Sequence, residues 1–298
     1  MDVKERTRKA YELFGKGDME TFFNEMIDDS IVWTFPGKEG VHPLSGVHKG
    51  KQAMMAAMSK IPAIWPNFHL KVLDMISEGN KVFVYAMAPF LSLRAIEQAK
   101  CGPGLMNLPI CMISVGIGLG YADAGPTHYA NEDFSCFRAV VGSSIYTPSD
   151  NTTTKFIAND MLDKPKFSYV RLDRDELKEL TPSLDNKDYI NGYKIFGKVS
   201  KKKIGVISHG KIYHNCLDAF DKEKDNYFLI NLFRAKPFPK NLVNEINKID
   251  KFLVVDEQSP SGNLSSCVFE GFSENRFFPK IISKSLPEKY VFENGGRE

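Results

Sequence analysis

The sequence predicts an α+β segment followed by two α/β units, each built on a parallel sheet. The chain has 298 residues, which leaves room for more than one domain. Its first 80 residues mix helices with isolated strands, whereas apolar strands and amphipathic helices alternate from residue 81 onward. That alternation is typical of parallel sheets covered by helices. The predicted boundaries are an N-terminal segment over 1–80, an α/β unit over 81–175, a linker over 176–190 and a second α/β unit over 191–298.

The elements of the N-terminal segment follow from the spacing of its apolar residues. Helices are predicted where these residues recur at helical spacing, and strands where they alternate or cluster beside Gly and Pro. The predicted helices cover 3–15, 19–26 and 50–61, and the predicted strands cover 31–35 and 68–75. Gly79-Asn80 then forms a turn into the first strand of the next unit.

The two α/β units are predicted from short apolar runs that alternate with longer amphipathic stretches. The predicted strands cover 82–88, 108–115, 143–146, 167–172, 203–208, 226–232 and 252–255, with an edge strand over 278–282. The predicted helices cover 90–99, 133–140, 150–162, 213–220, 241–249 and 261–272. Ser149-Asp150 offers a side-chain cap for the third of these helices.

Composition and charge exclude several classes of function. The net charge is +2, with 43% hydrophobic and 26% charged residues, so neither nucleic acid nor a membrane surface is expected as a partner. The five cysteines fit no Cys-x-x-Cys spacing, so no metal site is predicted and reduced thiols in the cytoplasm are expected. The longest apolar stretch, 106–117, contains Asn107 and Pro109 and is too short to span a bilayer.

One motif carries more chemistry than core packing requires. Gly125-Pro126-Thr127-His128 combines turn residues with two polar side chains, and Glu132-Asp133 follow within a few residues. The motif comes after the predicted strand 108–115, at the edge where α/β sheets place their ligands. His128 is therefore predicted to lie where a ligand is bound. The alternative is a turn histidine without a role.

From residue 81 the sequence resembles the C-terminal subunit of a split transketolase, which consists of a pyrimidine-binding domain and a C-terminal domain. The matching runs include Lys81–Ala86, Asn107–Pro109, Gly125–His128, Tyr169–Arg171 and Val254–Glu257. The resemblance implies two Rossmann-like parallel-sheet units, and a reaction that transfers a two-carbon ketol unit with thiamine diphosphate and Mg²⁺. A sugar phosphate is the implied substrate.

The resemblance also implies roles for three residues. Phe90 matches an aromatic position that stacks on the cofactor's pyrimidine, His128 matches a catalytic histidine that faces the substrate, and Arg171 matches an arginine that clamps a substrate phosphate. Each has a structural alternative. Phe90 would be a core residue, and Arg171 would form a surface ion pair with Asp173 or Asp150.

Two features that the family's complete active site needs are missing from the sequence. The family drives the cofactor's tautomer with a glutamate in a Gly-Ile-Ala-Glu-Gln type of motif, which does not occur here. The Gly-Asp-Gly plus Asn signature that holds the diphosphate and metal is also absent. The first α/β unit is therefore expected to be incomplete. A separate N-terminal, diphosphate-binding subunit would have to supply the diphosphate and metal side of the site, in a homo- or hetero-oligomer.

The N-terminal segment resembles a truncated SnoaL-like domain of the ketosteroid-isomerase superfamily, which folds as a cone around a pocket. The matching runs are Tyr11–Phe14, Asp28–Phe35, Leu44–Gly46 and Lys49–Lys51. The family's last three strands have no counterpart here, so a partial cone is expected.

Taken together, these patterns predict a transketolase-like C-terminal subunit that is inactive alone. Two alternatives remain. The chain would be a non-catalytic module for subunit interaction, or a chimeric reading frame whose N-terminal part binds a small molecule. The SnoaL-like segment stands where the family carries the missing glutamate motif. The inactive subunit, the interaction module and the chimera are three interpretations of this replacement.

Overall fold

The computed structural model describes residues 3–35, 40, 42–64, 76–78, 81–292, 295 and 297. These fall into two compact units, residues 1–80 and residues 81–298. The strand predicted over 68–75 lies outside the described residues. Within the described part of the chain, no helix is both long and apolar enough to cross a membrane.

The unit of residues 1–80 is mainly helical around a small antiparallel pair of strands. Its helical elements are α1 (Val3–Lys16), α2 (Met19–Thr21), the π-helix η1 (Phe22–Met26), α3 (Lys51–Met58) and α4 (Ile61–Ile64), and its strands are β1 (Val32–Phe35), β2 (Gly46–Lys49) and β3 (Ile76–Glu78). β1 pairs with β2 in antiparallel register. Phe22, Phe23 and Met54 form the buried core. This arrangement agrees with a partial SnoaL-like region.

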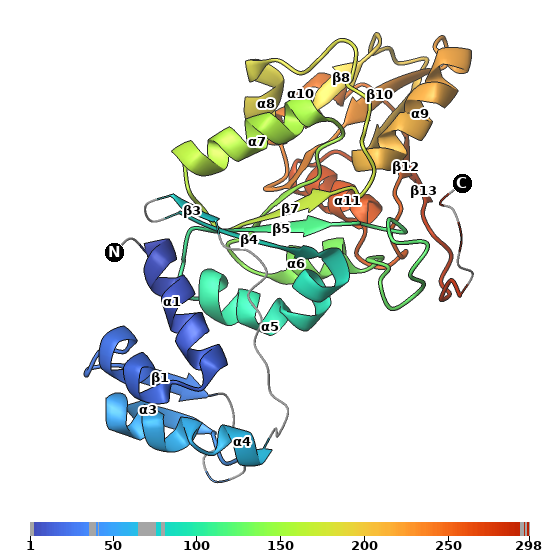
Figure 1. The fold of residues 1–298 in the computed structure, drawn as a ribbon. Coiled ribbons are helices and arrows are strands. Elements are labelled where there is room, and N and C mark those ends of the chain that lie inside the picture. Colours follow the sequence, from blue (N-terminus) through green and yellow to red (C-terminus); the bar gives the residue numbers. More distant parts are fainter. Residues whose placement is uncertain are drawn as a thin grey trace. The chain divides into compact units, whose positions relative to one another are not determined.

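A mixed sheet organises the first half of residues 81–298. Its strands within residues 81–298 are β4 (Lys81–Met87), β5 (Ile110–Val115), β6 (Ser144–Tyr146), β7 (Ser168–Leu172) and β11 (Arg234–Lys236), and these follow one another in the order β11-β6-β7-β5-β4. β4, β5, β7 and β6 are parallel to one another, and β11 is antiparallel to β6. One face carries α7 (Asn151–Asp163); the other carries α5 (Ile96–Ala99) and α6 (Asp133–Ala139), as Figure 1 shows.

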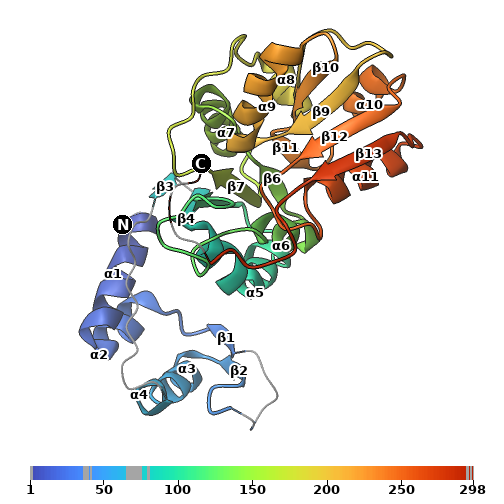
Figure 2. The ribbon, with the colours of Figure 1, turned by 90° about the vertical axis from the view of Figure 1, so that its right-hand side faces the viewer.

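A second sheet organises the other half. Its strands are β8 (Lys194–Phe196), β9 (Ile204–Ser208), β10 (Tyr227–Asn231), β12 (Lys251–Val255) and β13 (Lys280–Lys284), in the order β13-β12-β9-β10-β8. All neighbours are parallel except the pair of β10 and β8. α9 (Gly210–Glu223) lies on one face, and α10 (Lys240–Ile246) and α11 (Leu264–Glu274) lie on the other (Figure 2). The predicted succession of parallel-sheet units is confirmed.

Local sequence explains where the helices begin. The Asp150 carboxylate accepts a hydrogen bond from the backbone N–H of Thr153 at 2.7 Å, which caps α7 at the predicted position. The Asn263 side chain caps α11 in the same way. α8 (Asn186–Asn191) begins with a reciprocal capping box between Asp185 and Asp188, and it lies largely in the stretch predicted as a linker.

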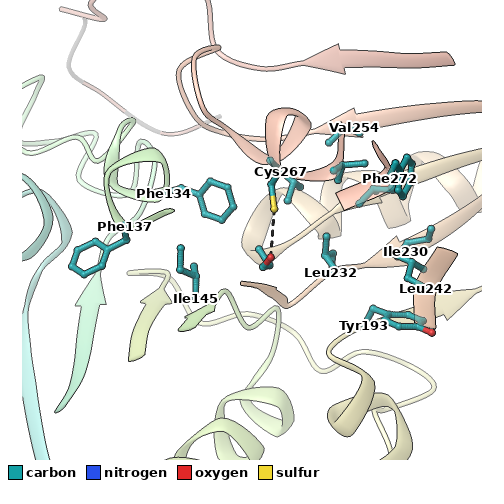
Figure 3. Close-up of a cluster of buried hydrophobic side chains, with 14 of the residues drawn as sticks. Phe134, Phe137, Ile145, Tyr193, Ile230, Leu232, Leu242, Val254, Cys267 and Phe272 are labelled. Atoms are coloured by element: carbon teal, nitrogen blue, oxygen red, sulfur yellow. Dashed lines mark hydrogen bonds between the residues drawn. The ribbon is translucent and has the colours of Figure 1, made fainter. Parts of the chain in front are cut away.

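The two sheets share one hydrophobic core. Phe134 and Phe137 of α6 belong to the same buried cluster as Val254 of β12 and Phe272 of α11 (Figure 3). Phe137 also stacks on Tyr169 of β7, with ring centroids 3.7 Å apart. Because fully buried aromatic rings contribute most of a core's hydrophobic free energy, the two halves stabilise each other.

Candidate functional site at the carboxyl ends of the strands

Two of the residues predicted from the sequence lie against each other. Phe90 begins the π-helix η2 (Phe90–Arg94), which follows β4, and His128 lies in the loop between β5 and α6. Their ring centroids are 5.3 Å apart in an edge-to-face arrangement, and both side chains are half-buried. The hydroxyl of Thr127 lies 2.9 Å from Nδ1 of His128, which orients the imidazole. Phe90 also faces Arg94, whose Cζ is 4.1 Å from the ring centroid.

Glycines shape the loop that carries His128. Gly118 has a φ of +58°, and a Cβ placed on it would lie 2.4 Å from the carboxylate of Glu257. Only glycine fits this close approach without rearrangement. The same residue exchanges two backbone hydrogen bonds with Ala130, at 3.2 and 2.9 Å, which close the base of the loop. The loop therefore has a fixed base, directly after the carboxyl end of β5.

Arg171, the third predicted residue, is almost completely buried. Its side chain on β7 is 1% exposed, and its guanidinium donates to both carboxylate oxygens of Asp133, at 2.8 and 3.0 Å. Nη1 also donates to the hydroxyl of Thr147 at 3.0 Å. The ion-pair partner is therefore Asp133 and neither Asp173 nor Asp150. The planar fork of arginine suits such a bidentate pair.

A buried His–Asp pair extends this network into the second sheet. His209 follows β9 and Asp256 follows β12, and Nε2 of His209 lies 3.2 Å from Oδ1 of Asp256. The same nitrogen is 3.3 Å from Nη1 of Arg171. Burial acts to raise the pKa of Asp256, but the His209 charge and hydrogen bond, together with Arg171, outweigh it and leave the pKa lowered. The carboxyl ends of both sheets thus meet in one charged cluster.

Asp256 should make the stability of the fold depend on pH. Because its pKa is lower in the folded state, the ionised group stabilises the fold above its ordinary pKa of 3.8, and this is lost as the pH falls through the folded-state value. Asp256→Asn is expected to cost about 1–3 kcal/mol of unfolding free energy at pH 7. The difference in unfolding free energy between the variant and the wild type, measured by urea titration, should become smaller below pH 3.8. A difference independent of pH would contradict this account.

The sequence pointed to Phe90, His128 and Arg171 but not to their partners. In the sequence, Asp133 and Asp256 stand out only as members of longer motifs. No spacing or motif in the sequence connects either residue with Arg171. Across the described residues, no cluster of three or more His, Cys, Asp or Glu side chains is placed to hold a metal ion. His209 keeps a buried Nδ1 that finds no hydrogen-bond partner within the described part of the chain.

A separate hollow lies within the unit of residues 1–80. Its volume is about 590 Å³, and it is lined mainly by apolar side chains, among them Phe14, Phe23, Met55 and Met58. Its size is in the range of small-molecule pockets.

Two family models match stretches in the first 179 residues of the chain. Residues 75–179 match the family "Transketolase, pyrimidine binding domain", and residues 7–91 match the family "SnoaL-like domain". The two matches overlap over residues 75–91. Both resemblances predicted from the sequence are thereby confirmed.

Curated relatives agree with the first of these assignments. One subunit of the apulose-4-phosphate transketolase of Phocaeicola vulgatus is 25% identical over 74% of this chain and 70% of its own length. "Transketolase-like protein 1" of Bos taurus is 26% identical over 75% of this chain but only 37% of its own length. For "1-deoxy-D-xylulose-5-phosphate synthase" of Prochlorococcus marinus the identity is 24%, over 73% of this chain and 35% of that protein. The chain thus spans little more than a third of these longer relatives.

A solved structure supports the fold. The "Split gene transketolase, inactive beta4 tetramer" aligns over 95% of this chain and 89% of its own length, with a TM-score of 0.60 and 18% identity. The transketolase from Campylobacter jejuni aligns with a TM-score of 0.56 over 71% of this chain and 32% of its own, at 18% identity.

Proposed function

We propose that this chain, a transketolase-like protein of the C-terminal subunit type, works as one subunit of a split, thiamine-diphosphate-dependent transketolase. It would transfer a two-carbon ketol unit only together with a separate diphosphate-binding subunit, and it would be inactive alone. The contact between Phe90 and His128, with ring centroids 5.3 Å apart, carries this proposal. In this proposal, the Phe90 ring stacks on the cofactor's pyrimidine and the His128 imidazole faces the substrate. Both side chains lie next to the carboxyl ends of the strands.

The residues present do not make a complete cofactor site. The Gly-Ile-Ala-Glu-Gln type of motif, whose glutamate drives the cofactor's tautomer in the family that this chain resembles, does not occur in the sequence. The guanidinium of Arg94 also lies over the Phe90 ring, where a pyrimidine would have to stack. This chain alone therefore holds only part of the proposed site, and a partner subunit has to complete it.

The substrate side of the proposal rests on His128 and, with a condition, on Arg171. A sugar phosphate is the proposed substrate class. Arg171 could contact its phosphate only if Asp133 released the guanidinium, because both carboxylate oxygens now accept from it. His128 is half-buried in the loop, and its side chain is held by Thr127 and by the ring contact with Phe90.

The cofactor titration is the direct test. We expect the isolated chain to show no saturable heat on titration with thiamine diphosphate and Mg²⁺, and no ketol transfer, because both the diphosphate-binding signature and the tautomer-driving carboxylate are missing from it. A diphosphate-binding transketolase subunit that also brings a carboxylate to the cofactor's pyrimidine should restore turnover, and His128→Ala in that complex should reduce it. Val141→Ala is the matched control, because that side chain is 84% exposed. Tight binding of thiamine diphosphate by the isolated chain would contradict the proposal.

The same experiment separates the alternatives. A complex that forms but shows no turnover would favour a non-catalytic interaction module. The chimeric alternative is favoured by the hollow of about 590 Å³ in residues 1–80. A rise in melting temperature with an apolar ring compound, in place of the cofactor, would support small-molecule binding there.

A further inference from the structure

Arg297 is among the most fully paired side chains of the unit of residues 81–298. Its Nη1 donates to both carboxylate oxygens of Asp173, each at 2.7 Å, and its Nε donates to Oε1 of Glu257 at 2.9 Å. Its Nη2 donates to the other oxygen of Glu257 and to the backbone carbonyl of Ile117, the latter at 3.3 Å. The side chain of Arg297 is only 9% exposed, and that of Asp173 is 2% exposed.

The two carboxylates come from different halves of the unit. Asp173 follows β7 in the first sheet, and Glu257 follows β12 in the second. One guanidinium therefore bridges the carboxyl ends of both sheets. If this guanidinium were removed, two poorly solvated carboxylates would lose their shared cation, which would cost folding free energy.

The third contact reaches the loop that carries His128. Ile117, whose carbonyl accepts from Arg297, and Gly118 lie at the start of this loop. Gly118 packs against the Glu257 carboxylate, which also accepts from Arg297. Gly118 in turn pairs with Ala130 on the other side of the loop. Gly295, two residues before Arg297, makes another contact midway along the loop. Its backbone N–H donates to the carbonyl of Ala122 at 3.1 Å.

From these contacts we infer that Arg297 is a positioning residue, which holds the loop 117–130 and so fixes His128 against Phe90. This role deepens the proposed function, because it says what keeps the substrate-facing imidazole in place. As a statement about catalysis it rests on that proposed function. As a statement about the order of the loop it stands on the contacts alone.

The alternative is a purely structural cross-link that stabilises the whole unit without a specific effect on the loop. The two roles differ in where the effect of losing Arg297 appears. A positioning role predicts a local change in the loop and in His128. A structural role predicts a uniform loss of protection over both sheets.

Hydrogen exchange and histidine NMR on the full chain distinguish these roles. Arg297→Ala is expected to speed exchange of the Gly118 and Ala130 amides by about tenfold or more, while β9 and β10 stay protected. The imidazole signals of His128 should shift, whereas those of His214 on α9 should not. Glu257→Gln, which keeps the shape of the side chain, should loosen the same amides and serves if Arg297→Ala folds poorly.

Arg174→Ala is the matched control. Arg174 pairs with Asp123 and lies over the Tyr121 ring in the middle of the same loop, but the Arg174 and Asp123 side chains are 43% and 64% exposed. Its removal should therefore leave the Gly118 and Ala130 amides at the base of the loop unchanged. The inference is overturned if loop exchange and the His128 signals stay as in the wild type, or if protection falls equally across both sheets. A complex without turnover but with this loop response would count against the proposed function and not against the role of Arg297.

Discussion

Arg171→Met is expected to lower the free energy of unfolding by about 3–5 kcal/mol, because it leaves the Asp133 carboxylate buried without its cation. Asp133 is 0% exposed, and among the described residues the side-chain donor that would remain to it is the hydroxyl of Tyr169, at 2.9 Å. One neutral hydrogen bond does not offset the cost of desolvating a carboxylate. The effect should be among the largest of any single substitution in the unit of residues 81–298.

Chemical denaturation can measure this loss in the intact chain. Both tryptophans, Trp33 and Trp65, lie in the first 80 residues, so their fluorescence reports on that unit and backbone circular dichroism reports mainly on the rest. Arg171→Met should shift the circular-dichroism transition and not the fluorescence transition. The double variant Arg171→Met/Asp133→Leu should recover most of the loss, since it removes both charges. A single variant no less stable than Arg174→Ala would refute the account.

Phe252→Ala is expected to cost about 3–5 kcal/mol by opening a cavity in the second sheet's core. Phe252 is 0% exposed and packs edge-to-face on Phe272 and Phe277, with centroids 5.2 and 6.0 Å away. Its ring also fills the space beside Gly205, where an added Cβ would lie 2.5 Å from Cε1. Because its neighbours come from α11 and from the segment before β13, they cannot all relax into the space it leaves.

Phe278→Ala is the control of the same residue type. Its ring is 72% exposed just before β13, so its removal should change the circular-dichroism midpoint very little. Similar losses for the two variants would mean that the packing around Phe252 contributes less than its burial indicates.

The strand and helix pattern was predictable because it is local. β5 is a short apolar run that is buried or half-buried throughout, as expected for a central parallel strand, and Asp150 caps α7 where the sequence placed it. The short strands β8 and β11 were missed, since three residues give no periodicity. α8 was missed as well, although Asp185 and Asp188 have the spacing of a capping box.

The candidate site was predictable only in its parts. The motif around His128 has a recognisable combination of residues, whereas the partners of Arg171 are set by tertiary structure. Asp133 lies 38 positions before it, and His209 lies 38 positions after it. The pairing of Arg171 with Asp133 explains why an arginine expected near the surface is buried. No spacing rule could supply that contact.

The position of β11 bears on how this protein can be divided. β11 comes from the last third of the chain, yet it forms the edge of the first sheet beside β6. Cutting the chain between residues 176 and 190 would therefore deprive the N-terminal fragment of an edge strand and leave the backbone of β6 open to other chains. In the uncut chain the two sheets should melt in one cooperative step, and fragments expressed separately should aggregate unless they are produced together.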